Sequence, residues 1–115
     1  MQQVSIFLYE LDLPWVMEVM DRTDPDIRDK LPIVDISPNG RMPLLVDPNT
    51  GVKLWESAAI IEYLLDEYDH EGRLRYHESP QKYEQRTWAY FQMSGQGPYF
   101  GMSCSLLVSI ECMLS

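Results

Sequence analysis

The sequence has no hydrophobic run that could cross a membrane, since no stretch reaches the roughly 18 apolar residues that a span requires. Its first residues carry no basic region followed by an apolar run, so we expect no secretory signal. Cysteine is scarce, and Cys104 and Cys112 form no disulfide framework. The two cysteines do not have the spacing of a redox pair or of a zinc-binding pair, so we expect both thiols to be buried. These features favour a reduced, cytoplasmic protein.

Positive charge is also scarce. Lys and Arg total 9 against 18 Asp and Glu, which gives a formal net charge of −9. A chain with this charge repels phosphate backbones and anionic lipid, so we expect neither nucleic acid nor membrane as a partner. A small anionic ligand is still compatible, because local groups decide its binding. His70 and His77 flank an acidic stretch without the spacing of a metal cage, so we predict no metal.

The chain of 115 residues, 45% of them hydrophobic, is long enough to bury a substantial core. Apolar residues at helical spacing predict an amphipathic helix over 3–11, which Pro14 ends. The run at 15–20 alternates weakly and is compatible with a β-strand. A helix-start signal, Thr-Asp-Pro-Asp, then predicts one or two short helical turns over 25–36, interrupted at Pro32.

Turn residues organise the middle of the chain. Residues 37–43 read as a loop. Two short apolar runs, 44–47 and 52–55, flank Pro-Asn-Thr-Gly and predict a β-hairpin. A helix with one apolar stripe follows at 57–68.

The last third is read as a linker followed by helix. The polar stretch 69–80, with Gly72 and Pro80, is the best linker candidate. A second helix is predicted from about 79 to 93, and Ser-Gly-Gln-Gly-Pro at 94–98 should break or bend it. The aromatic residues of this region are read as packing between helices rather than as a base-stacking surface.

Two motifs carry a family resemblance. Residues 37–43 read Ser-Pro-Asn-Gly-Arg-Met-Pro, and residues 54–64 read Leu-Trp-Glu-Ser-Ala-Ala-Ile-Ile-Glu-Tyr-Leu. Together, in this order and at this spacing, they resemble the amino-terminal domain of the cytosolic glutathione S-transferase family. Residues 88–98 look like the opening of the all-helical second domain in the nitrogen-regulator-like and nu-class subgroup of fungi and bacteria. The resemblance covers about residues 3–101.

This resemblance implies an α/β (α+β) fold. Its parts are a thioredoxin-like amino-terminal domain that lacks its first strand and the beginning of an all-helical carboxy-terminal domain. We accordingly assign 1–70 to a partial glutathione-binding domain, 71–80 to a linker and 81–115 to a shortened start of the helical domain. We expect a chain truncated at both ends. A truncated gene model and a naturally shortened paralogue both give this pattern.

The resemblance also implies a glutathione site. Ser57 stands where a strand gives way to a helix, so its hydroxyl, its N–H and the helix dipole favour a carboxylate. The family assigns the γ-glutamyl carboxylate there, and Glu56 is placed to pair with the ammonium. A plain helix cap at Ser57 is the alternative. Pro43 would be a cis-proline that exposes the backbone of Met42 to an extended peptide. Arg41 is either a partner for a ligand carboxylate or a solvated loop arginine.

No residue here matches the donor that activates the thiol in this family, because that loop would precede Gln3. Ser5 and Tyr9, inside the first helix, are not assigned that role. We predict a glutathione S-transferase-like enzyme that conjugates glutathione to an electrophilic small molecule, in fungal secondary metabolism or detoxification. A homodimer is expected from the family. The alternatives are a non-catalytic glutathione-binding or regulatory protein and an inactive fragment.

Overall fold

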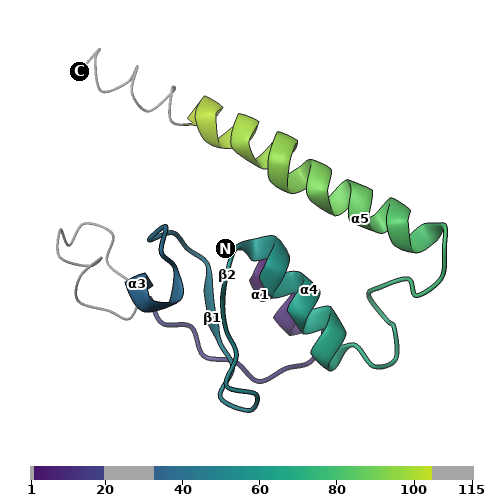
Figure 1. Ribbon diagram of the computed structural model, residues 1–115, viewed down its shortest axis with the longest axis horizontal. Helices are drawn as coiled ribbons and strands as arrows, with labels where there is room; N and C mark the ends of the chain where they lie inside the picture. The colour runs from purple at the N-terminus through teal and green to yellow at the C-terminus, as the bar shows by residue number, and fades with distance from the viewer. Residues whose placement is uncertain (1, 20–32, 105–115) are drawn as a thin grey trace. The chain divides into compact units, whose positions relative to one another are not determined.

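The computed structural model describes residues 2–19 and 33–104, and the chain divides into two compact units, Met1–Leu74 and Arg75–Ser115. The first unit holds α1 (Gln2–Glu10), α3 (Ile33–Ile36), β1 (Leu44–Val46), β2 (Lys53–Trp55) and α4 (Ser57–Tyr68). The second holds α5 (Gln81–Phe91) and the π-helical turn η1 (Gln92–Gln96) (Figure 1). The linker and domain limits given above stay predictions. None of the described helices is long and apolar enough to span a membrane.

The predicted hairpin is confirmed. Strands β1 and β2 pair antiparallel, with Leu44 opposite Trp55 and Val46 opposite Lys53. The turn closes where the N–H of Asp47 donates to the carbonyl of Val52 over 2.9 Å. Gly51 takes a φ of +76°, a left-handed conformation that glycine adopts without steric cost.

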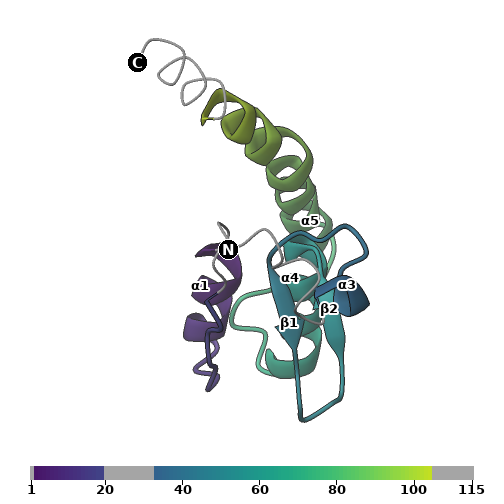
Figure 2. The ribbon, with the colours of Figure 1, turned by 90° about the vertical axis from the view of Figure 1, so that its left-hand side faces the viewer.

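The core of the first unit lies where α1 packs against α4. Four side chains from the two predicted apolar stripes are buried together: Val4, Leu8, Ile60 and Leu64. Leu45 and Leu54 of the hairpin pack against this cluster, so the two strands rest on the helix pair. Figure 2 shows α1 and α3 on opposite sides of the hairpin. Both helices agree with the prediction, α1 ending before Pro14 and α4 ending at Tyr68.

The structure does not confirm a β-strand in the β-compatible run at 15–20. Residues 15–19 form no strand, and residue 20 lies outside the described residues. A strand exists through hydrogen bonding to a neighbour, and the described sheet contains only β1 and β2, so no described strand pairs with this segment. The helical turns predicted over 25–36 fall outside the described part except for α3 at its end.

The break or bend predicted at 94–98 is confirmed in part: the regular α-helix α5 ends at Phe91, although the chain continues as helix through this segment. Residues 92–96 wind as a π-helix, in which the N–H of Gly97 reaches back to the carbonyl of Gln92, and residues 97–104 continue as α-helix. A π-turn absorbs the helix-breaking sequence by shifting the hydrogen-bond ladder by one residue. Pro80, predicted in the first turn, is the N-cap of α5.

The second unit buries little of its aromatic surface. Trp88 and Phe91 meet edge to face with ring centroids 5.9 Å apart. Both side chains are nevertheless exposed, and within the described residues of this unit the expected packing between helices is not seen. Cys104 is exposed, contrary to the buried thiol expected, because no described element of its unit covers it. Cys112 lies outside the described residues.

Candidate functional site

The hairpin brings the two sequence motifs to one end of the first unit. Met42 and Pro43 directly precede β1, and Glu56 and Ser57 directly follow β2. Because the first residue of β1 pairs with the last residue of β2, Pro43 and Glu56 flank the open end of the hairpin together. The peptide bond between Met42 and Pro43 is cis, as the family resemblance implies.

Glu56 is the N-cap of α4 and has a backbone φ of 71°. A non-glycine residue in this left-handed region costs of order 1–3 kcal/mol, and such residues concentrate at functional sites. The Glu56 side chain makes no capping hydrogen bond and is exposed. Ser57 is therefore the first residue inside the helix, so the alternative that Ser57 is itself a plain N-cap is wrong.

The amino-terminal end of α4 is suited to an anion. The first turn contains no acidic residue, and the side chain of the N-cap residue Glu56 makes no capping hydrogen bond. The first intrahelical bond runs from the N–H of Ile60 to the carbonyl of Glu56 over 3.0 Å. The amides before Ile60 point out of the helix end by helix geometry, and the helix dipole adds partial positive charge there. A carboxylate at this end is thus stabilised by backbone groups.

Arg41 lies in a loop that a buried serine organises. Ser37 is fully buried, its hydroxyl oxygen accepts the N–H of Arg41 over 3.3 Å, and its carbonyl accepts the N–H of Gly40 over 2.8 Å. The Arg41 residue is exposed, so its guanidinium is accessible to a ligand. A contact between Arg41 and a ligand carboxylate stays a prediction.

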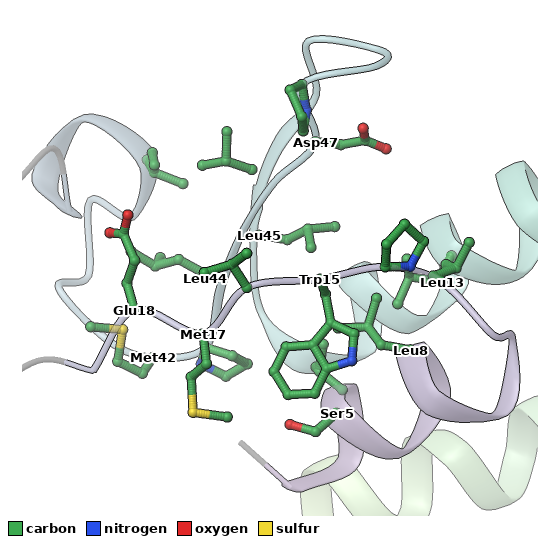
Figure 3. A pocket seen from close by; sticks show the side chains of 18 of the residues that line it. Ser5, Leu8, Leu13, Trp15, Met17, Glu18, Met42, Leu44, Leu45 and Asp47 are labelled. Atoms are coloured by element: carbon green, nitrogen blue, oxygen red, sulfur yellow. The ribbon is translucent and has the colours of Figure 1, made fainter.

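A cleft of about 880 Å³ lies beside this end of the hairpin (Figure 3). Of the five predicted site residues, Met42 and Pro43 line the cleft, whereas Arg41, Glu56 and Ser57 do not. The other cleft walls come from residues 13–18, from β1 and the turn after it, and from side chains of α1, α3 and α4. The predicted site therefore lies at one rim of the cleft, not within it.

A carboxylate–tyrosine cluster at the other end of the hairpin was not foreseen. The buried Asp47 accepts hydrogen bonds from the hydroxyls of Tyr63 (2.6 Å) and Tyr68 and from the N–H of Asn49 (2.9 Å). Because the Tyr63 hydroxyl donates its hydrogen bond to Asp47, its oxygen accepts a hydrogen bond from the hydroxyl of Thr50 over 2.7 Å. The Asp at the start of a Pro-Asn-Thr-Gly turn was the available signal.

These bonds set the charges of the cluster. The tyrosine hydroxyls, that of Tyr63 first and that of Tyr68 next, lower the pKa of Asp47 from 3.8 to about 2. Burial and then the hydrogen bond to Asp47 raise the pKa of Tyr63 to about 12. The hydrogen bond to Asp47 also raises the pKa of Tyr68. At neutral pH the cluster is one carboxylate held by two neutral phenols, which fastens the hairpin to α4.

Comparisons with known proteins agree on one family. Residues 1–67 match the family model described as the glutathione S-transferase amino-terminal domain. The chain is 41% identical over 106 residues to "Glutathione S-transferase-like protein gedE" of Aspergillus terreus, a match over 89% of this chain and 44% of that protein. It is 36% identical over 105 residues to "Protein URE2" of Candida maltosa, over 88% of this chain and 32% of that protein.

A solved structure shows the same fold. The glutathione transferase URE2P6 from Phanerochaete chrysosporium, in complex with oxidized glutathione, matches with a TM-score of 0.76 and 39% identity. The match covers 86% of this chain and 46% of that one. The chain thus spans less than half the length of each of these relatives.

Proposed function

Because residues 1–67 match its amino-terminal domain, the chain belongs to the glutathione S-transferase family, and we propose that it binds glutathione at the open end of the β1–β2 hairpin. Its fold is that family's thioredoxin-like amino-terminal domain, with a small antiparallel sheet and helices, followed by the start of the helical domain. Among its relatives are URE2 proteins, and solved relatives hold glutathione.

One observation carries this proposal: the hairpin register sets Met42–Pro43 beside Glu56–Ser57. The γ-glutamyl carboxylate binds the amino-terminal end of α4, with Ser57 as a further donor. Glu56 pairs with the glutathione ammonium. The backbone of Met42 pairs with the extended tripeptide, and Arg41 neutralises a ligand carboxylate.

The proposed reaction is conjugation. The glutathione thiol gives its proton to solvent water, and its sulfur attacks an electrophilic carbon of a small molecule. A sulfur–carbon bond forms as the leaving group departs with the bonding electron pair or, in an addition, as the resulting carbanion takes a proton from water. A cytoplasmic homodimer that serves biosynthesis of secondary metabolites or detoxification is the physiological setting we propose. The fungal origin of the relatives named above supports it.

A glutathione-binding protein without turnover is the second candidate. None of the residues assigned to the site has the role of a hydrogen-bond donor to the thiolate, the group that lowers a thiol pKa during activation. Binding needs only the helix end, the hairpin edge and the charged side chains, so it does not depend on that donor.

Isothermal titration calorimetry with the full chain tests the proposed site. Glutathione should bind, and cysteinylglycine, which lacks the γ-glutamyl group, should bind at least about tenfold more weakly. Equal affinities, or no heat with a folded sample, would refute the site. A conjugation assay with a chloronitrobenzene electrophile then separates enzyme from binder: glutathione-dependent product supports the first candidate, and binding without product supports the second.

A further inference from the structure

The loop that joins α3 to β1 contains an asparagine followed directly by a glycine (Figure 1). Residues 37–40 read Ser-Pro-Asn-Gly and form a turn, which closes where the N–H of Gly40 donates to the carbonyl of Ser37 over 2.8 Å. Gly40 has a φ of +62°, a conformation that glycine adopts without steric cost. The turn thus joins the side-chain amide of Asn39 to a following backbone nitrogen that has no side chain beside it.

Asn39 is accessible to water. The residue is exposed, and within the described part of the chain no hydrogen bond holds its side chain. Gly40 is partly exposed. The amide of Asn39 can therefore turn toward the nitrogen of Gly40 when the hydrogen bond between Gly40 and Ser37 opens, and solvent can react with the product.

This pair can lose its amide without an enzyme. The nitrogen of Gly40 gives its proton to solvent and attacks the Cγ atom of Asn39. A bond forms between this nitrogen and Cγ, the bond from Cγ to Nδ2 breaks, and Nδ2 takes a proton from water and leaves as ammonia. Water then opens the resulting cyclic imide at one of its two carbonyls. The products are aspartate and isoaspartate, and water is the only co-reactant.

The second asparagine of the sequence, Asn49, provides a comparison within the same chain. Asn49 is also exposed and also lies in a turn. The N–H of the next residue, Thr50, is hydrogen-bonded to the carboxylate of Asp47, just as the N–H of Gly40 is bonded within its own turn. Thr50, however, carries a β-branched side chain next to this nitrogen, which hinders the attack. We therefore expect the reaction at Asn39 and not at Asn49.

The reaction would change the loop that carries Arg41. It converts a neutral amide into a carboxylate two residues before Arg41, and both residues are exposed. This carboxylate attracts the guanidinium of Arg41 in competition with a ligand carboxylate. The isoaspartate form also lengthens the main chain of the turn by one methylene group, although the buried Ser37 holds the N–H groups of both Gly40 and Arg41.

We propose that Asn39 is a site of spontaneous deamidation, and that the aspartate or isoaspartate formed there weakens the binding of anionic ligands beside Arg41. The first part depends on the turn 37–40 alone. The second part rests on the glutathione site proposed above, in which Arg41 neutralises a ligand carboxylate. Because the reaction needs only water, the loss of affinity accumulates with the age of the molecule.

Peptide mapping of the aged full chain tests the first part. Trypsin leaves Asn39 in the peptide 31–41 and Asn49 in the peptide 42–53, and neither peptide contains glutamine. After incubation in mildly alkaline buffer, mass spectrometry should show conversion of amide to acid at least about tenfold faster in 31–41 than in 42–53, with a fresh sample as the baseline. Equal rates in the two peptides, or no conversion in 31–41, would refute deamidation at Asn39.

Two substitutions at Asn39 test the second part. Asn39→Asp introduces the carboxylate without ageing, and Asn39→Ala removes the amide without adding charge. Because Asn39 is exposed, both fresh variants should fold, which circular dichroism checks. By isothermal titration calorimetry, Asn39→Asp should bind glutathione about two- to fivefold more weakly than the native chain, and Asn39→Ala should differ by less than about 1.5-fold. The effect of Asn39→Asp should shrink at high salt, which screens exposed charges.

The outcomes separate this inference from the proposed function. Equal affinities of the native chain and Asn39→Asp would refute the second part, and equal weakening by the two substitutions would refute its electrostatic basis. If the native chain bound no glutathione, the glutathione site and the second part would both fail. The mapping is done without glutathione, so it decides whether Asn39 deamidates in either case.

Discussion

The hydroxyl of Tyr63 donates a 2.6 Å hydrogen bond to the buried carboxylate of Asp47 and so joins the middle of α4 to the end of β1. Tyr68, one turn and a half further along α4, donates to the same carboxylate oxygen, and the two rings meet edge to face. One carboxylate thereby fixes the hairpin to two turns of the helix. The position of Asp47 relative to α4 is set by these bonds as well as by apolar packing.

Tyr63→Phe removes one donor to this carboxylate without changing the ring. We expect a loss of about 1–3 kcal/mol in the free energy of unfolding, because a hydrogen bond to a charged buried group is lost. Urea denaturation followed by circular dichroism measures it. Tyr9→Phe is the control, because Tyr9 is 76% exposed. If both variants unfolded at the same urea concentration, the Asp47 cluster would have no measurable role in stability.

Acid should release the same cluster. The pKa of Asp47 is lowered from 3.8 to about 2 in the folded chain, first by the hydroxyl of Tyr63 and then by that of Tyr68. A depressed carboxylate pKa stabilises the fold above the unfolded pKa, and this contribution disappears as the pH falls through the folded pKa. The stability difference between the native chain and Asp47→Asn should thus be full above about pH 4 and shrink toward about pH 2. Urea midpoints over this pH range check it, and a constant difference would contradict it.

The packing of α4 on α1 predicts a large effect at one isoleucine. Ile60 is fully buried in the core cluster, so Ile60→Ala should destabilise the first unit by about 2–5 kcal/mol through lost burial and a cavity. Ile6→Ala is the matched control, since Ile6 is 57% exposed on α1. Thermal unfolding followed by circular dichroism should show a marked shift for Ile60→Ala alone. Similar shifts for the two variants would mean that the core is not where α1 meets α4.

Local signals account for the parts of the fold that the sequence predicted. The hairpin follows from a Pro-Asn-Thr-Gly turn between two apolar runs, and α4 follows from its stripe of apolar residues. The segment at 15–20 carries a β-compatible pattern but needs a neighbouring strand, which a local pattern does not supply. At 94–98 the glycines and Pro98 indicated a break or bend, and the structure interrupts the α-helix with a π-turn at 92–96 that keeps the backbone hydrogen-bonded.

The candidate site, like the fold, was predictable from the sequence only in part. Met42–Pro43 and Glu56–Ser57 were found because each motif is contiguous, and the hairpin register then places them together. The Asp47 cluster joins residues 16 and 21 positions apart through side chains, and nothing local pairs an aspartate with a particular tyrosine. The left-handed backbone conformation of Glu56 could not be predicted from the sequence either, because glutamate rarely adopts a positive φ.

Ser57→Ala tests the assignment of a carboxylate to the amino-terminal end of α4. Alanine is a good helix former, and Ser57 is not the N-cap, so the helix should persist while the ligand loses one hydroxyl donor. Glutathione binding should weaken by about 1–3 kcal/mol, or roughly 5- to 150-fold in Kd, by isothermal titration calorimetry. Ser94→Ala is the control, because the Ser94 hydroxyl donates to the carbonyl of Tyr90 within its own helix. Retained glutathione affinity in Ser57→Ala would mean that Ser57 contributes nothing to carboxylate binding, and the backbone amides of the helix end would then act without it.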